Sequence, residues 1–445
     1  MRHRIAAVFH ALARLAFGAT IVLIPFRWRI IIAARPFPPV FRDYSDFLFF
    51  ASDWFVLATL ALWTLTYFFE PRRLRFTPLF LTIPIAGLTV IGTASAVSSF
   101  DPALSIYHST RLLALFGLYL FVLNEIGSLR DIYLPMGCAV FVQSAVGIGQ
   151  VFQQRSLGLL SIGELLLNPE WKGISTVWTG TTLSLRAYGL TDHPNILGGC
   201  LAVALLSIAV WYASTHSAWR ALIASLVALG ALALLLTFSR SAWLALGTGA
   251  LLGVFLFLAT RQTRLVIDWV ALGFASAIVV APFAWQDAGF LAVRLDPNAP
   301  SLFNGQARAV VERAALNAAT LEIFAQHPLL GAGLGTTPLV IRATHPDFAF
   351  DYQPAHLVLL DVAAETGVIG ALFYLAAMTA PWIALWRNRS RVTFSPALIG
   401  VSGVLLAVTV IGFFDYYTWL LIPGRLLQWL SWGLWGATFS GASNV

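Results

Sequence analysis

The feature that most constrains this chain is a series of apolar runs, each roughly 20 residues long, joined by short polar connections. A helix of about 20 apolar residues crosses the roughly 30 Å hydrocarbon core of a bilayer. Lipid offers no partners for backbone N–H and C=O groups, so such runs are expected to be helical. The sequence therefore predicts an all-α integral membrane protein. By this criterion about twelve spans are expected, near residues 5–25, 47–68, 78–98, 108–124, 132–153, 194–213, 219–237, 241–260, 264–283, 357–386, 395–413 and 419–438.

Composition agrees with this fold class and argues against others. Hydrophobic residues make up 59% of the chain and charged residues 11%, whereas soluble domains carry roughly 25% charged residues. The net charge of +7 comes from arginines scattered between apolar runs, without the basic stripe of a nucleic-acid-binding protein. Membrane lipids are therefore the expected partners, and nucleic acid is not. Cys138 and Cys200 each lie within an apolar run, which argues against a disulfide framework or a cysteine-based metal site.

The start of the chain has two interpretations. Arg2, His3 and Arg4 precede an apolar run, as in a signal peptide. The run contains Arg14, however, and it lacks an obvious small-x-small cleavage site. We therefore expect an uncleaved first span.

Basic residues indicate the orientation. Two short connections carry arginine clusters, at 72–75 and 387–391, on the side that holds the N-terminus. The positive-inside rule assigns that side to the cytoplasm. The opposite side nonetheless keeps several arginines, among them Arg186 and Arg240. A bacterial inner membrane fits this distribution, with the longest polar stretch in the periplasm.

That polar stretch divides the chain into three parts. Residues 1–281 hold about nine expected spans, residues 282–356 form the periplasmic segment, and residues 357–445 hold about three more. Within the segment, Asn304–Gln326 has the spacing of an amphipathic helix, with Val310, Val311, Leu316 and Leu321 among its apolar residues. The glycine-rich stretch at 327–335 is not a nucleotide-binding loop, because no Gly-Lys-Ser/Thr follows it and no strand precedes it.

Arg240 and Arg186 each permit two interpretations. Arg240 lies in a tight turn, Thr-Phe-Ser-Arg-Ser-Ala-Trp, between two apolar runs. It is either an interfacial arginine that reaches lipid headgroups or an anion clamp, for which a permanently charged guanidinium is well suited. Arg186 poses the same choice. The Thr-Asp-His-Pro-Asn that follows it is a helix-start signal, in which Asp192 and His193 can act as cap and turn residues.

Two further candidates lie in the periplasmic segment. Arg308 is a candidate anion-binding residue, but it is four residues before Glu312 and could form an ordinary helical ion pair. His356 opens the next span and is suited to proton transfer near neutral pH, with an interfacial side chain as the alternative. His345 and His356 do not have the spacing of metal ligands, so no metal is expected.

The order of short motifs carries a family resemblance. Ser239-Arg240-Ser241 is followed by His-Pro-Leu-Leu-Gly-Ala-Gly at 327–333, and then by His356 before Glu-Thr-Gly at 365–367. Between about residues 186 and 370 this order resembles the superfamily of O-antigen ligases and O-antigen polymerases. The resemblance implies a GT-C-like, all-helical membrane glycosyltransferase. Its ligase members act in lipopolysaccharide biosynthesis and transfer a glycan from undecaprenyl diphosphate to the lipid A core oligosaccharide on the periplasmic face.

The resemblance also implies roles for individual residues. Arg240 matches a family arginine that binds the donor diphosphate, and Arg308 matches a second essential arginine. Arg186 is a further substrate-binding candidate, and Asp415 matches an outer-loop aspartate. His356 matches the family histidine and would act as general base in a metal-independent, inverting transfer that needs no cofactor.

Other functions remain open at this stage. A polymerase would join two undecaprenyl-linked glycans, and a protein O-oligosaccharyltransferase would have the same build. We favour the ligase because one long outer segment lies between Arg240 and His356. A multi-span transporter belongs to a different class, and the few charges at mid-span positions, without an evident inverted repeat, argue against it.

Overall fold

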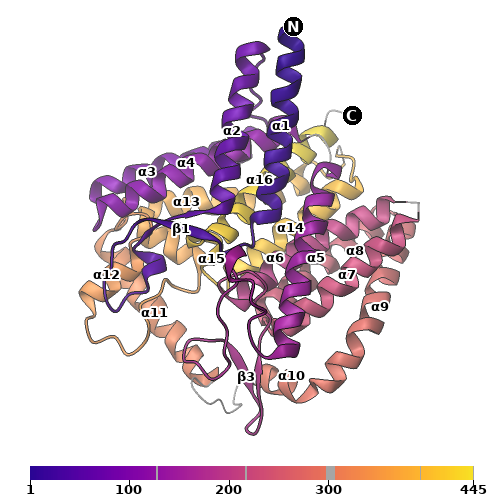
Figure 1. Ribbon diagram of the computed structural model, residues 1–445. Coiled ribbons are helices and arrows are strands. Elements are labelled where there is room, and N and C mark those ends of the chain that lie inside the picture. The colour runs from indigo at the N-terminus through magenta and orange to yellow at the C-terminus, as the bar shows by residue number, and fades with distance from the viewer. Residues whose placement is uncertain (127–128, 216–217, 297–305, 391, 444–445) are drawn as a thin grey trace.

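The structure, a computed structural model, describes the chain except for residues 127–128, 216–217, 297–305, 391 and 444–445. Helices dominate it (Figure 1). Among the described residues, ten helices are long and apolar enough to cross a membrane. These are α1 (Arg2–Leu23), α2 (Ala51–Phe69), α3 (Leu79–Ala94), α4 (Pro102–Glu125), α5 (Arg130–Gln153), α6 (Pro194–Ser214), α7 (Trp219–Leu236), α8 (Arg240–Ala259), α9 (Thr263–Gln286) and α13 (Val358–Arg387).

The remaining elements are shorter or more polar. They are the helices α10 (Ala288–Leu295), α11 (Gln306–Gln326), α12 (Thr337–Thr344), α14 (Pro396–Gly412), α15 (Tyr417–Leu420) and α16 (Ile422–Ser443), and the 3-10 turns η1 (Arg42–Tyr44), η2 (Ser95–Ser98) and η3 (Leu160–Ile162). Two antiparallel hairpins pair β1 (Arg29–Ala33) with β2 (Phe47–Phe50) and β3 (Thr176–Trp178) with β4 (Leu183–Leu185).

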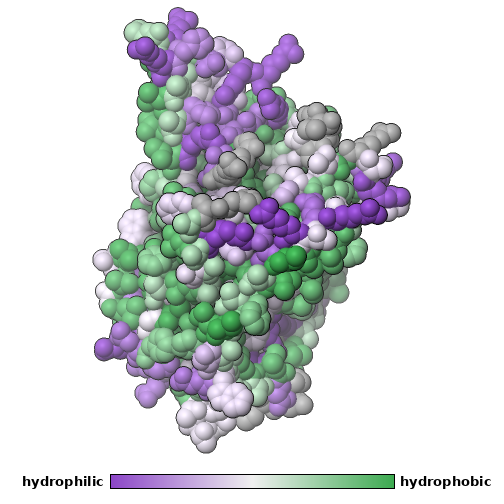
Figure 2. Space-filling model, turned by 90° about the vertical axis from the view of Figure 1, so that its right-hand side faces the viewer, coloured by the Kyte–Doolittle hydropathy of each residue, from purple (hydrophilic) through white to green (hydrophobic). Residues whose placement is uncertain are grey.

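The prediction of an all-α, multi-pass membrane protein is confirmed, although the exact number of spans is not. Hydrophobic residues gather in a band across one face, with hydrophilic residues above and below it (Figure 2). Of the twelve expected spans, α14 has only 17 residues, and α16 is not among the ten helices that meet the length and hydropathy criteria. The second expected span also begins later than predicted, because residues 47–50 form strand β2.

The helix α6 forms the centre of the bundle. Its most apolar stretch is 83% buried, the largest buried share among the ten candidate spans of the described chain. The residues of α6 are apolar on nearly every face, as expected for a helix that other helices enclose. It packs against α7, α8, α14 and α16. The first residues of α6 are therefore fixed in position relative to all of these neighbours.

The polar segment lies at the end of the bundle opposite the two termini, where α10, α11 and β3 appear in Figure 1. The expected amphipathic helix is present as α11, while residues 304 and 305 lie outside the described chain. Its buried face differs from the predicted one. Leu316 is fully buried, but Val310, Val311 and Leu321 are more than half exposed. The buried face is set by packing against α12 and α13.

The glycine-rich stretch crosses α13 at a break in that helix. Gly367 has a φ of 69° and interrupts the helix. On either side of the break, Val368 N–H donates to the Pro328 carbonyl at 2.8 Å, and Ala332 N–H donates to the Ala364 carbonyl at 2.8 Å. A Cβ atom on Gly367 would lie 2.1 Å from the Leu329 oxygen. The crossing therefore needs glycine, both for its backbone angle and for the close approach of two main chains.

We expect Gly367→Ala to destabilise the protein. Backbone strain alone should cost about 1–3 kcal/mol, and the overlap with the Leu329 carbonyl adds to it. Thermal unfolding in detergent measures the loss. Gly441→Ala in α16 is the matched control, because a Cβ atom there meets nothing within 4 Å. Equal melting temperatures for the two variants would contradict this account of the crossing.

Candidate functional site

A buried arginine joins three elements at the polar-segment end of the bundle. Arg186 is 5% exposed. Its Nε donates to the Thr237 carbonyl at 2.6 Å, and its Nη2 donates to Asn195 Oδ1 at 2.7 Å. Asn195 Nδ2 in turn donates to Asp415 Oδ2 at 2.9 Å. Arg186 and Asp415 are thus linked through the first turn of α6, and both are fixed to the turn before α8.

The turn between α7 and α8 places Arg240 at the start of a helix. Phe238 adopts a positive φ of 49°, and Ser239 N–H donates to Thr237 Oγ1 at 3.2 Å. Arg240 is the first residue of α8 and is half-buried. The first N–H groups of a helix and its dipole both favour an anion. A guanidinium at the same point strengthens that preference.

Two more arginines approach from the polar segment. Arg294 of α10 donates from Nε to the Phe238 carbonyl at 2.8 Å. Burial, followed by the positive charges of Arg186, Arg240 and Arg313, lowers the pKa of Arg294 to about 8. Arg313 of α11 also acts electrostatically on Arg240. We refer to these four residues as the arginine cluster.

Like charges held together at a half-buried site repel one another. Burial lowers the pKa of Arg186 to about 10, although Tyr188 and Asp415 oppose that shift. With pKa values of about 10 and about 8, Arg186 and Arg294 remain mainly charged at neutral pH. A bound anion would relieve their repulsion, and an anion with several oxygens could accept from more than one of them. The arginine cluster is therefore a site suited to a phosphate-bearing ligand.

His356 lies beside this cluster, two residues before α13. Its ring meets the ring of Tyr416 edge-on, with the centroids 5.1 Å apart. Burial, together with the charge of Arg313, lowers the pKa of His356, while Asp415 and the Phe414 carbonyl oppose the shift. A neutral imidazole at pH 7 can accept a proton. Its Nδ1 is buried and has no hydrogen-bond partner among the described residues.

Two buried carboxylates hold the backbone around His356. Asp361 Oδ1 accepts from the N–H of Ala355, the residue before His356, at 2.8 Å. One turn further along α13, Glu365 accepts from Trp419 Nε1 at 2.8 Å and from Thr337 Oγ1 at 3.2 Å. These acids therefore anchor the loop and the glycine-rich stretch within the bundle.

The structure brings together four of the five predicted site residues: Arg186, Arg240, His356 and Asp415. The fifth, Arg308, is exposed, and its guanidinium lies over the Phe350 ring at 5.4 Å. Arg313 is the residue of α11 whose charge acts on Arg240 and His356. Five residues along a helix correspond to a rotation of about 140°, so the two arginines point in different directions.

Sequence reasoning did not single out Arg294 or Arg313 as site residues. The available signal for Arg294 was a lone charge in the apolar stretch Phe-Leu-Ala-Val-Arg-Leu. His193, in contrast, caps α6 as one interpretation held, with Nδ1 accepting from Asn195 N–H at 3.1 Å. Burial lowers the pKa of His193 to about 3, which keeps that nitrogen free to accept. The described residues contain no group of three His, Cys, Asp or Glu side chains that could hold a metal ion.

The hydrogen bond from Ala355 to Asp361 gives a test of this anchoring. We expect Asp361→Ala to lower the free energy of unfolding by about 1–3 kcal/mol, because a buried N–H loses its acceptor. Asp361→Asn keeps an acceptor oxygen and should retain more of the stability. Thermal unfolding in detergent compares the two variants. Equal losses would show that Asp361 contributes something other than this hydrogen bond.

Comparison with known protein families gives a match over part of the chain. Residues 224–375 match the family model described as O-antigen ligase, while no curated protein matches the chain. The matched range runs from within α7 into α13 and contains Arg240, Arg294, Arg313 and His356. The resemblance predicted from the sequence is thereby confirmed for residues 224–375, which match the O-antigen ligase family model.

Proposed function

We propose that the protein is an O-antigen ligase, which transfers a glycan from undecaprenyl diphosphate to a hydroxyl of the lipid A core oligosaccharide. The reaction would take place on the periplasmic face of a bacterial inner membrane. The observation that carries the proposal is the meeting of four arginines and a histidine of lowered pKa at the start of α8. The family match supports a lipid-linked glycan donor and a glycan-accepting partner.

The arginine cluster would hold the diphosphate of the donor. Arg240, Arg294 and Arg313 present guanidinium groups from three different helices, and the first N–H groups of α8 add to their field. Negative charge grows on the diphosphate as its bond to the sugar breaks. Donors that are already in place stabilise this charge without reorganisation. The guanidinium groups would stabilise this charge in place of a divalent cation, so we predict that the enzyme is active without metal.

His356 would act as the general base. The acceptor hydroxyl oxygen attacks the anomeric carbon from the face opposite the diphosphate, and the anomeric configuration inverts. The hydroxyl proton passes to the imidazole, while the bonding pair leaves with the diphosphate. Asp415 stabilises the imidazolium as it forms, since a nearby carboxylate favours the protonated ring. The products are the glycosylated core and undecaprenyl diphosphate, with no need for ATP.

The first test is transfer by purified, EDTA-treated protein from undecaprenyl-diphosphate-linked glycan to lipid A core. His356→Ala should lower kcat by about 100- to 10,000-fold, the usual contribution of a general base. Arg313→Ala should lower it by about 100-fold or more. Arg308→Ala, on the same helix, is the matched control and should stay within a few-fold of wild type.

Three outcomes would change the proposal. Full activity of a folded His356→Ala variant would remove the base. Equal losses for Arg308→Ala and Arg313→Ala would remove the assignment of Arg313 to the diphosphate. If wild type lengthens the lipid-linked glycan and ignores the core acceptor, the enzyme is a polymerase with the same donor site.

The environment of His356 predicts a shift in pH dependence. The base must be neutral, so the acid limb of the kcat/KM profile follows the pKa of His356. Asp415 raises this pKa, so Asp415→Asn should lower it and move the acid limb to lower pH. Arg313 lowers the pKa, so Arg313→Gln should move the residual activity's acid limb to higher pH. Profiles that superimpose on wild type would argue against His356 as the titrating group.

A further inference from the structure

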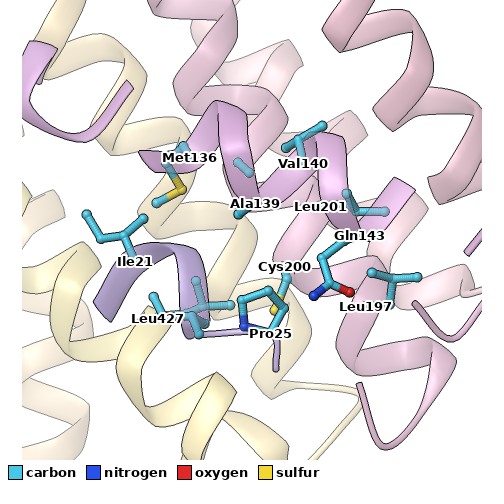
Figure 3. A pocket seen from close by; sticks show the side chains of 12 residues that line it. Ile21, Pro25, Met136, Ala139, Val140, Gln143, Leu197, Cys200, Leu201 and Leu427 are labelled. Atoms are coloured by element: carbon cyan, nitrogen blue, oxygen red, sulfur yellow. The ribbon is translucent and has the colours of Figure 1, made fainter. Parts of the chain in front are cut away.

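The connection between α1 and α2, residues 24–50, lies outside the range that matches the family model. It begins at a small pocket of about 20 Å³, where Pro25 lies beside Cys200 of α6 (Figure 3). Further along the connection, Tyr44 is buried in one hydrophobic cluster with Leu316 of α11. The α1–α2 connection therefore joins the centre of the bundle to the polar segment.

Ion pairs fix the α1–α2 connection to the loop before α6. Arg27 Nε donates to Asp192 Oδ1 at 2.7 Å, and Arg29 Nη1 donates to Asp192 Oδ2 at 2.6 Å. Arg29 also donates from Nη2 to Asp43 Oδ1 at 2.6 Å. Because Asp192 and Arg29 each have two partners, these residues form a network, which holds its geometry better than an isolated surface pair does. Tyr44, the residue after Asp43, is thereby fixed in position.

Tyr44 connects this network to the stretch after α14. Its hydroxyl oxygen lies 2.6 Å from that of Tyr416, and the Tyr416 hydroxyl donates to Gln353 Oε1 at 3.2 Å. A phenol has one proton to donate, so the Tyr416 hydroxyl accepts from Tyr44. Burial raises the pKa of both phenols, which keeps both hydroxyls protonated. Two hydrogen bonds at its hydroxyl therefore fix the ring of Tyr416.

Tyr416 in turn restrains His356. The two rings meet edge-on, with their centroids 5.1 Å apart and their planes at 74°, an arrangement that aromatic pairs prefer. Nδ1 of the imidazole has no hydrogen-bond partner among the described residues, so ring packing supplies restraint that a hydrogen bond there would give. Asp415, the residue before Tyr416, accepts from Asn195 at 2.9 Å. Tyr416 is thus anchored through its neighbour as well as through its own hydroxyl.

We infer that Tyr416 is a positioning residue for His356, and that the α1–α2 connection, acting through Tyr44, is part of the site. The inference rests on the proposed function and adds to it a segment outside the family match. The two tyrosines limit the rotation of the imidazole and so keep its accepting nitrogen directed at the acceptor hydroxyl. Small displacements of a reacting group have large effects on rate. The arginine cluster includes neither tyrosine, so loss of their hydrogen bond should change kcat and leave the donor KM unchanged.

The test removes one hydroxyl at a time. Tyr44→Phe and Tyr416→Phe keep the rings and should each lower kcat for glycan transfer about tenfold. The double variant should lose no more than Tyr416→Phe alone, because that substitution already breaks the bond between the two hydroxyls. Tyr107→Phe is the matched control, since the Tyr107 hydroxyl donates to the Leu48 carbonyl at 2.6 Å and holds the same connection at another point. Its kcat should stay close to that of wild type.

A chemical measurement follows His356 without relying on glycan transfer. Diethyl pyrocarbonate modifies the neutral imidazole ring, and mass spectrometry measures the rate at His356 separately from the rates at the other histidines. In Tyr416→Leu, which loses the restraining ring, this rate should rise about threefold or more because the imidazole opens to solvent more often. In Tyr107→Phe the rate should equal that of wild type.

The two measurements separate the inference from the proposed function. Equal modification rates in wild type and Tyr416→Leu, or additive losses of kcat in the double variant, would overturn the inference while the proposed function stands. A loss of kcat in Tyr107→Phe as large as that in Tyr44→Phe would also overturn it, because the connection would then contribute stability alone. If wild type transfers no glycan but His356 is modified faster in Tyr416→Leu, the proposed function fails and the restraint on the histidine stands.

Discussion

The site depends on one buried guanidinium, that of Arg186. Burying a charge is costly unless hydrogen bonds compensate it, and Arg186 finds them on the Thr237 carbonyl and the Asn195 amide. These bonds fix the turn before α8 against the first turn of α6, which the surrounding helices already hold. Arg240 is presented from that turn, and Asp415 is held through Asn195. Arg240, which we propose binds the diphosphate, and Asp415, which raises the pKa of His356, thus share one support.

A second support comes from main chain rather than side chains. The glycine-rich stretch is hydrogen-bonded to α13 on both sides of the break at Gly367. Arg313 precedes this crossing, and His356 lies after the glycine-rich stretch, on the loop between α12 and α13. Backbone contacts at both ends of that loop limit how far the histidine can move from the arginines. Functional groups on a loop thereby gain the stability of the helical bundle.

The sequence could predict the membrane class, most of the spans, and the grouping of Arg186, Arg240 and His356, because hydropathy and turn positions determine which end of a helix a residue occupies. It could not identify the inward face of α11. Leu316 is buried as expected, but Val310, Val311 and Leu321, which have the right spacing for the same apolar side, are exposed, and packing against α12 and α13 buries Ile323, which was not predicted. The same rotation exposes Arg308 and brings Arg313 to the cluster. Which face of such a helix is buried depends on tertiary contacts, and the spacing of apolar residues along the sequence does not determine it.

The bond network around Arg186 also bears on how the protein is made. Its members come from the loop before α6, from the first turn of α6, from the end of α7 and from the stretch after α14, so the network joins residues 186 to 415. Membrane proteins are synthesised and inserted from the N-terminus, and domains form in that order. The early helices must therefore hold Arg186 before Asp415, which lies further along the chain, has been synthesised. Only when the last third of the chain has entered the membrane can the charges balance, so a nascent or truncated chain contains no complete site.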